Sequence, residues 1–257
     1  MDVVALLPRL HLLRFPVGQA YLWRDGDAWT LIDAGPAGSG AAIAEAVTAL
    51  GSDPRAVRRI VLTHFHEDHV GGAGEFAALS GAEVLAHRLD APFVRGELPG
   101  PEPLFEDWER PLHEQARRLL PQGGFVRPEE VTELGGGEVL EVGGGAHVVH
   151  VPGHTRGSIA LHLPRHGVLF TGDTVAASPV DGSVIPGVFN LDRGQVLAAC
   201  GRLADLGADV ACFGHGDPVT AGASRALRNA ARGHHAEAGH DAVGHGTRVR
   251  PTRRSAR

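Results

Sequence analysis

The sequence predicts an α/β domain, of the α+β kind, in which helices pack outside two stacked β-sheets. Two stretches rich in short strand-like runs occupy residues 21–86 and 138–170, and helix-like segments accompany each of them. A sheet with one apolar face buries that face against another layer, so two such halves favour two stacked sheets. The 257 residues are 43% hydrophobic and 21% charged, which is typical of a soluble globular chain and excludes a wholly disordered one.

The first half predicts, in chain order, the two strands of a hairpin, a helix, a strand, a second helix and a further strand. The hairpin is indicated by the turn Arg24-Asp25-Gly26-Asp27 between two apolar runs. Ser39 stands at the N-cap position of the first helix, and Gly51 closes that helix. The residue ranges are 21–23, 29–32, 41–50, 59–62, 73–79 and 83–86.

The second half is predicted from apolar runs that Gly, Pro and polar turns separate. We expect strands over 138–142, 146–151, 159–163, 168–170 and 209–213, and helices over 194–206 and 218–231. Residues 1–231 then form one domain, which a chain of this length can fill with a single core. Residues 232–257 hold six Arg, four His and no aromatic residue, so we expect a disordered, basic tail there.

The charged residues exclude several classes of function. All 24 basic residues are Arg, which excludes Schiff-base and P-loop chemistry because both need a lysine amine. Outside the tail, 18 of the 24 Arg stand against 28 of the 30 acidic residues, which argues against a nucleic-acid-binding face. Two cysteines, Cys200 and Cys212, are too few for a disulfide framework. Since no export signal or long apolar run occurs, we expect a cytoplasmic protein that does not bind a membrane.

A run of metal-binding residue types follows one predicted strand. Within His64-Phe65-His66-Glu67-Asp68-His69, four side chains are of the kinds that bind divalent metals. His64 and His66 point the same way in an extended chain, because side chains alternate. A helical turn beyond them would swing Asp68 and His69 toward a neighbouring point. The spacing therefore predicts two ligand pairs for two adjacent metal ions rather than a solvated polar loop.

Four further residues stand at Gly-marked turns after predicted strands: Asp33, His154, Asp173 and His215. Turns of this kind present functional side chains from a rigid scaffold, so we expect these residues at the same edge of the sheets. Imidazoles with carboxylates and no cysteine suit Zn²⁺, with Fe or Mn as alternatives. Two divalent ions, two carboxylates and a hydroxide leave a small positive charge, which holds an activated water near neutral pH.

This ordered set resembles the metallo-β-lactamase superfamily over residues 10–220, and is similar to glyoxalase II, the lactonases and above all the stand-alone bacterial hydrolases. The resemblance implies an αββα sandwich, two mixed sheets flanked by helices, with the site at one edge. It implies these ligands: His64, His66 and His154 for the first zinc ion, Asp68, His69 and His215 for the second, and Asp173 as the bridging carboxylate. Asp33 resembles the family's acid that orients a liganding histidine; the other interpretation is a turn residue beside a helix.

The resemblance also implies an activity, in which hydroxide activated by two zinc ions hydrolyses a carboxylic ester, thioester or lactone bond of a small acyl substrate. Asp68 and Asp173 are expected to take part in catalysis, Asp68 by assisting proton transfer. Glyoxalase II adds a C-terminal helical domain, and the lactonases use a tyrosine near the carbonyl, whereas the one tyrosine here is Tyr21 in the first hairpin. Two alternatives stay open: a mononuclear iron persulfide dioxygenase, and a metal-stabilised binding protein without turnover.

Residues 91–130 interrupt the strand pattern and are predicted to form an insertion. The segment is rich in proline and holds eight acidic residues against five Arg. We expect its aromatic residues to form an apolar lid over the metal site: Phe93, Phe105, Trp108 and Phe125. The acidic excess repels polyanions and so favours an uncharged, partly hydrophobic substrate. The other interpretation is a pair of helices that pack on the domain or on the partner of a homodimer.

Overall fold

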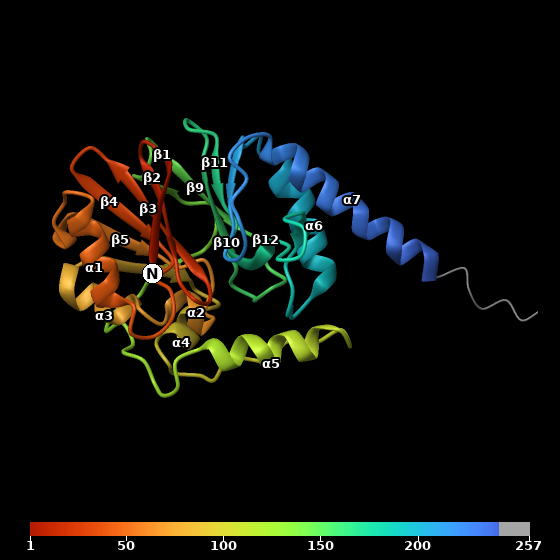
Figure 1. Cartoon of the computed structure of the whole chain (residues 1–257), viewed down its shortest axis with the longest axis horizontal. Helices are drawn as coiled ribbons and strands as arrows, with labels where there is room; N and C mark the ends of the chain where they lie inside the picture. Colours follow the sequence, from red (N-terminus) through yellow and green to blue (C-terminus); the bar gives the residue numbers. More distant parts are fainter. Residues whose placement is uncertain (242–257) are drawn as a thin grey trace, which may run out of the picture.

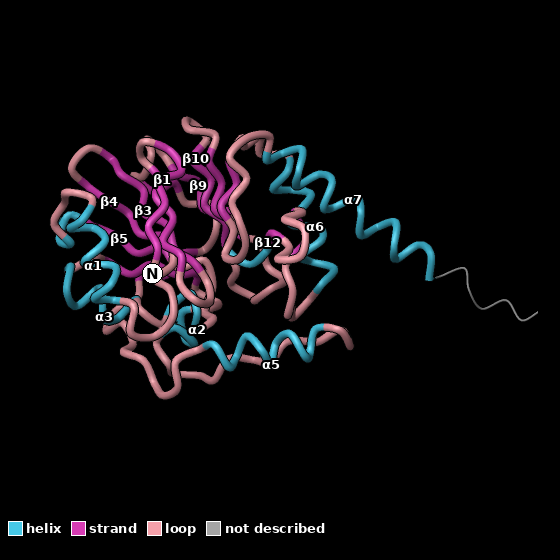
Figure 2. Tube along the Cα trace, in the orientation of Figure 1, coloured by secondary structure: helices cyan, strands magenta, loops and turns pink. Residues whose placement is uncertain are grey.

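The computed structural model describes residues 1–241, with side chains as far as Arg232, and arranges them in four layers. Two β-sheets lie face to face in the middle, and helices cover the outer face of each (Figures 1 and 2). The helices over the first sheet are α1 (Gly40–Ala49) and α3 (Ala73–Ser80), and those over the second are α6 (Arg193–Ala204) and α7 (Ala223–Asp241). The predicted αββα sandwich is confirmed.

The first sheet is mixed and holds its strands in chain order: β1 (Asp2–Leu7), β2 (Leu10–Arg14), β3 (Gln19–Asp25), β4 (Ala28–Ile32), β5 (Val57–Val61), β6 (Glu83–His87) and β7 (Thr132–Leu134). Neighbours pair antiparallel from β1 to β4 and parallel from β4 to β7. The hairpin between β3 and β4 turns at Gly26, whose φ of +61° is a conformation that glycine adopts without strain. Neither β1 nor β2 alternates between apolar and polar residues, so the sequence pattern does not predict them.

The second sheet has the strand order β14 (Val210–Cys212), β11 (Val168–Phe170), β10 (Ile159–Leu163), β9 (Ala146–His150) and β8 (Val139–Leu140). β14 runs parallel to β11, and the other neighbours are antiparallel. The strands predicted in this half are present, with their ends shifted by a few residues at most. A short ribbon of β12 (Val175–Ala177) and β13 (Val184–Pro186) packs beside α6 and α7.

Apolar side chains of both sheets meet in the middle of the sandwich. Trp23 and Ile32 of the first sheet lie in one buried cluster with Leu161 and Phe170 of the second. Two further clusters fill the outer faces, one under α1 and α3 and one under α6 and α7. Burial of this kind is the main favourable term in folding. Apolar residues fill the space between the sheets and under the helices, which leaves the ends of the strands for polar side chains.

Three further α-helices are short or peripheral, and two 3-10 helices, Pro54–Ala56 and Gly172–Thr174, lie between strands. α2 (Glu67–Val70) follows β5, and the predicted insertion contains α4 (Ala91–Val94) and α5 (Glu109–Leu119). α7 continues to Asp241, past residue 231 where we predicted the end of the domain. The rest of the predicted tail, 242–257, lies outside the described residues. Among the described helices, none is long and apolar enough to cross a membrane.

Candidate metal centre

The polar side chains singled out in the sequence gather at one edge of the sandwich. In the first sheet β4 and β5 run parallel, so Asp33 and His64, which follow their carboxyl ends, are neighbours. In the second sheet β9, β11 and β14 share one direction, and His154, Asp173 and His215 follow them. The loops of the two sheets therefore meet where the strands end.

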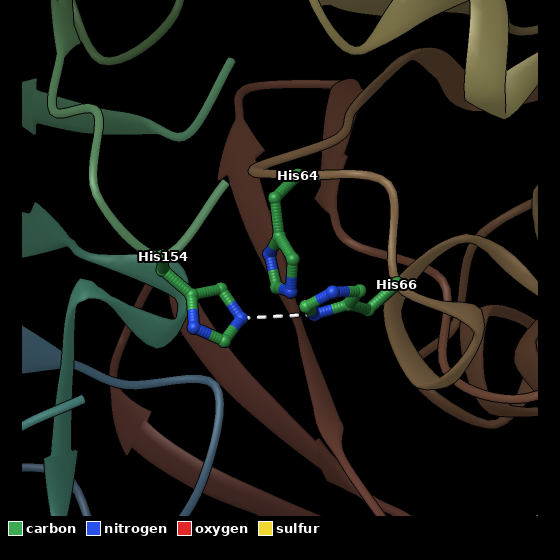
Figure 3. A group of neighbouring side chains, drawn as sticks. All are labelled: His64, His66 and His154. Carbon is green, nitrogen blue, oxygen red and sulfur yellow. Dashed lines mark hydrogen bonds between the residues drawn. The ribbon is translucent and has the colours of Figure 1, made fainter. Parts of the chain in front are cut away.

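Three histidines form the first group of possible ligands. His64 and His66 come from the loop after β5, and His154 comes from the loop after β9. Figure 3 shows the three rings turned toward one another. Nε2 of His154 lies 2.9 Å from Nδ1 of His66, and one ligand atom from each residue lies within 4.8 Å of the others. A set of three imidazoles is one that Zn²⁺ binds.

Asp68, His69 and His215 form the second group, again with ligand atoms within 4.8 Å of one another. Nε2 of His215 lies 3.1 Å from Oδ2 of Asp68. Asp173 lies between the two groups, because its Oδ1 is 3.3 Å from Nε2 of His69 and its Oδ2 is 3.6 Å from Nε2 of His154. The structure therefore brings all seven candidate ligands together.

Buried polar atoms without partners mark the centre of this cluster. Nε2 of His64, Nε2 of His69 and Oδ1 of Asp173 are buried and have no hydrogen-bond partner among the described residues. Such an atom costs about 1–3 kcal/mol, and metal ions bound by the two groups would satisfy all three. Gly214 makes room for the cluster, since a Cβ there would lie 1.9 Å from Oδ1 of Asp173. The residues present therefore fit divalent metal ions.

The histidines differ in their affinity for protons. Burial, together with a neighbouring histidine, lowers the pKa of His66 to about 3, and burial holds the pKa of His64 well below its ordinary value. Both are therefore neutral, which is the form that binds metal. Burial lowers the pKa of His215 as well, but Asp173 and Asp68 outweigh burial and raise this pKa to about 10. A metal ion competes with a proton for this imidazole, so binding there releases protons.

Asp33 holds two of the histidines from behind. Its Oδ2 accepts hydrogen bonds from Nδ1 of His69 at 2.9 Å and from Oγ1 of Thr63 at 2.8 Å, and its Oδ1 accepts from the N–H of Thr63 at 2.7 Å. Oγ1 of Thr63 accepts in turn from Nδ1 of His64 at 3.0 Å. These bonds put the protons on Nδ1 and leave Nε2 of both rings aimed at the centre. Asp33 thus contacts a candidate ligand, as the resemblance implies.

Asp90 ties the loops of the two sheets together, and no pattern in the sequence marks it. It follows β6 and is 1% exposed. Its Oδ2 accepts hydrogen bonds from the N–H of Phe65 at 3.1 Å and the hydroxyl of Thr155 at 2.7 Å, and its Oδ1 accepts from the N–H of Gly157 at 2.8 Å. Burial raises the pKa of Asp90 to about 6, although these donors act in the opposite direction.

Two further buried residues support the ligand loops. Nδ1 of His154 donates to Oδ1 of Asn190 at 3.2 Å as well as to a backbone carbonyl at 3.0 Å. The hydroxyl of Tyr21 donates to the carbonyl of Phe213 at 2.7 Å and so steadies the loop that carries His215. Tyr21 is 3% exposed, so it does not take the place of the lactonase tyrosine near a substrate carbonyl.

A cavity of about 240 Å³ opens over the candidate ligands. Its apolar walls include Val17, Phe65, Leu120 and Phe189. Charged side chains also border it: Glu67, Glu102 and Arg117. Leu120, Glu102 and Arg117 belong to the insertion, so this segment forms one side of the cavity.

The four aromatic residues that we expected to form a lid lie elsewhere. Phe93 packs against Phe65 with ring centroids 4.7 Å apart, Trp108 is 52% exposed, and Phe125 packs against the outer core. Phe105 packs beside His113, with ring centroids 4.7 Å apart. The insertion instead borders the cavity through His113, Ala116 and Arg117 of α5, and the four aromatic residues lie outside that helix.

Comparisons with known proteins agree with this geometry. The family model described as "Metallo-beta-lactamase superfamily" matches residues 13–215. The acyl-coenzyme A thioesterase MBLAC2 of Gallus gallus is 33% identical over 163 residues, which are 61% of this chain and 53% of that protein. A hydroxyacylglutathione hydrolase of Cereibacter sphaeroides is 33% identical over 120 residues, which are 46% of this chain and 34% of that protein.

A solved structure shows the same fold over most of the chain. A metallo-beta-lactamase family protein of Thermus thermophilus matches with a TM-score of 0.64 and 30% sequence identity, over 93% of this chain and 81% of that chain. The two curated relatives are matched over about half and a third of their own lengths. Their names therefore describe the activities of those whole proteins.

Proposed function

The chain belongs to the metallo-β-lactamase superfamily, and from this premise we propose that it is a metal-dependent hydrolase of a carboxylic acyl bond with two zinc ions per chain. The observation that carries the proposal is the position of Asp173, whose two oxygens lie 3.3 Å and 3.6 Å from nitrogens of the two ligand groups. A shared carboxylate offsets part of the charge of two neighbouring cations. The buried atoms without partners support the same arrangement.

The ligands divide between the two ions as two of the three groups of neighbouring ligand atoms do, and the third group, His64, His69 and Asp173, joins them. His64, His66 and His154 would hold the first zinc ion and Asp68, His69 and His215 the second, with Asp173 serving both. When bound, zinc supplies an activated water near neutral pH and polarises a carbonyl oxygen.

The protein's own side chains orient the ligands and shape the cavity around the reacting bond. Asp33 and Thr63 orient His69 and His64, and the apolar cavity walls keep bulk water from the reacting bond. Burial raises the pKa of Asp68, but His69 and His215 outweigh it and hold this pKa well below its ordinary value. A carboxylate with so low a pKa is a weak base. We therefore assign Asp68 to metal binding rather than to proton transfer.

We propose a thioester as the substrate. Acyl-coenzyme A and hydroxyacylglutathione, for which the two relatives are named, are both thioesters. The cavity supports the same choice, since Val17, Phe65, Leu120 and Phe189 offer an apolar surface to an acyl chain. Glu67 beside the cavity disfavours a polyanionic group close to the reacting bond.

Hydrolysis assays on zinc-loaded protein test the proposal. We expect turnover of acyl thioesters and no turnover of phosphodiesters. His66→Ala and Asp173→Ala should lower kcat/KM for the thioester by at least about 100-fold, because each removes a metal ligand. His147→Ala, which removes an exposed imidazole on β9, is the matched control and should leave kcat/KM unchanged.

Two results would contradict the proposal. Protein that holds about one iron per chain and consumes oxygen would be a dioxygenase. Protein that needs metal for stability, yet leaves every ester, thioester and lactone intact, would be a binding protein.

A further inference from the structure

The insertion is fastened to the body of the protein through a buried carboxylate. Glu109 is 1% exposed and is the one buried residue of α5, all of whose residues the structure describes. Its Oε1 accepts a hydrogen bond from the N–H of Phe189 at 3.1 Å, and its Oε2 accepts from the N–H of Glu106 at 2.9 Å. A second bond joins the N–H of Leu104 to the carbonyl of Asn190 at 2.9 Å. Both attachments reach the same loop, which precedes α6.

The same loop also accepts hydrogen bonds from a candidate metal ligand, His154. Nδ1 of His154 donates to the carbonyl of Val188 at 3.0 Å and to Oδ1 of Asn190 at 3.2 Å. The amide nitrogen of Asn190, which is 3% exposed, donates to the carbonyl of Gly187 at 2.7 Å. Phe189, which Glu109 binds, stands between the two residues that orient His154. A displacement of Phe189 would therefore disturb the carbonyl of Val188 and the side chain of Asn190, which accept hydrogen bonds from His154.

Phe189 has a backbone conformation that needs outside support. Its φ is +58°, in the left-handed region that an aromatic residue rarely adopts. Its ring lines the cavity over the metal site and contacts the insertion, with centroids 5.1 Å from His113 and 6.3 Å from Phe105. The hydrogen bond to Glu109 is thus made by the residue whose conformation is costly and whose ring shapes the cavity.

We propose that Glu109 is a positioning residue, a clasp that holds the insertion against the cavity and fixes both the Phe189 wall and the acceptors of His154. The requirement for a carboxylate follows from the geometry, because two N–H groups point at two different oxygens. A glutamine has the same shape but offers one oxygen, so one of the two N–H groups would face an amide N–H. The effect on substrate specificity rests on the proposed hydrolase function, whereas the effects on the insertion and on zinc binding do not.

Glu109→Gln tests the clasp, with Glu114→Gln, an exposed acid on the same helix, as the matched control. Trypsin reports the attachment of the insertion, because Arg117 and Arg118 offer cleavage sites on α5. We expect Glu109→Gln to speed cleavage there by about tenfold, since a buried hydrogen bond to a charged group is lost. Zinc affinity should fall by up to about tenfold. KM for a long-chain acyl thioester should rise more than KM for acetyl thioester, with kcat nearly unchanged.

The three measurements separate the outcomes. Cleavage at the wild-type rate overturns the clasp. Faster cleavage with unchanged zinc affinity and unchanged KM also overturns it, because Glu109 would then be a structural anchor and position nothing. If wild-type protein hydrolyses no substrate, the hydrolase proposal fails, while the cleavage and zinc measurements still decide the clasp.

A second variant covers the case in which Glu109→Gln does not fold. Phe189→Gly keeps the backbone conformation available, because glycine adopts positive φ freely, and removes the ring from the cavity. We expect this variant to fold, to bind zinc as the wild type does, and to show the same rise in KM for the long-chain substrate. Trypsin should cleave it at the wild-type rate, because the N–H of residue 189 that Glu109 binds is kept. Cleavage as fast as that expected for Glu109→Gln would overturn the clasp, and an unchanged KM would overturn the role of the Phe189 wall.

Discussion

Replacing Asp90 by Asn should make the protein more stable at neutral pH and a weaker metal binder. Asp90 is buried, and its two oxygens serve donors from the loops of both sheets: the N–H of Phe65, the hydroxyl of Thr155 and the N–H of Gly157. An amide has one oxygen, so it can hold one of the two loops and must face the other with an N–H. The variant keeps the size of the side chain and removes its charge.

The expected gain in stability follows from the pKa of Asp90. Burial raises this pKa to about 6 in the folded protein, whereas the pKa of an unfolded Asp is about 3.9. Between these values the folded state binds more protons than the unfolded state, so the free energy of unfolding falls as pH rises from about 4 to above 6. Two pKa units correspond to about 3 kcal/mol. The Asn variant has no carboxyl to ionise at position 90, so it does not lose this free energy of unfolding. Residues that support an active site often lower stability in this way.

Urea unfolding of chelator-treated protein at pH 4, 5.5 and 7.5 measures this effect. The difference in unfolding free energy between Asp90→Asn and wild type should shift toward the variant by about 2–3 kcal/mol across this range. Other titrating groups are shared by both proteins and cancel. Asp27→Asn, which neutralises an exposed turn acid, should show no such shift. A difference that is constant, or that moves toward the wild type as pH rises, would show that ionised Asp90 does not destabilise the folded protein.

Three further predictions concern the metal centre. Asp33→Asn should weaken zinc binding by about 10–100-fold in competition with a chromophoric chelator, because it removes an acceptor of a liganding imidazole; affinity within threefold of wild type, about 0.6 kcal/mol, would contradict this. Gly214→Ala should lower the zinc content measured by elemental analysis, since its Cβ would lie 1.9 Å from a ligand oxygen, whereas Gly201→Ala, which meets nothing within 4 Å, should not. The neighbouring carboxylates raise the pKa of His215 to about 10 and that of His69 well above its ordinary value, so protons must leave before zinc binds and affinity should fall by at least about tenfold for each pH unit of acidification. Zinc addition in weak buffer should release at least one proton per chain, and no release would count against this assignment.

The candidate ligands could be predicted from the sequence because their signal is local. Four of them fall within the run His64 to His69, and the other three follow apolar runs at Gly-marked turns. Turns that follow strands of the same direction lie at the same edge of a sheet. β11 and β14 are parallel neighbours, so the turns that carry Asp173 and His215 lie side by side. Asp33 was accessible to the same reasoning, since it ends the run that forms β4.

The residues that support the ligands could not be predicted, because their partners lie far away in the sequence. Asp90 meets Gly157 from 67 positions away, and Glu109 meets Phe189 from 80 positions away. Neither acid stands at a recognisable sequence distance from a candidate ligand. Each finds its hydrogen-bond donors only after folding has brought the loops together. A buried acid of this kind looks like a surface residue until its donors are known.

Local rules also erred where a distant residue replaced the expected one. Ser39 stands directly before α1, as its N-cap propensity predicts, yet its side chain makes no capping hydrogen bond. Glu75 of α3 accepts from the N–H groups of Gly38 and Gly40 instead, at 3.2 Å and 3.1 Å. The tertiary contact satisfies the N–H of Gly40, one of the donors that the first turn of α1 leaves without a partner inside the helix. The expected aromatic lid does not form, because Phe93, Phe105 and Phe125 pack against other residues while α5, which contains none of the four, lines the cavity.

We propose one hydrolytic centre in which seven side chains hold two metal ions. Titration of metal-free protein with zinc, while acyl thioester hydrolysis is followed, measures how many ions that centre needs. The rate should rise until two zinc ions are bound per chain and then stay constant. Full turnover with one equivalent of zinc, or no turnover with two, would rule out a centre of this kind.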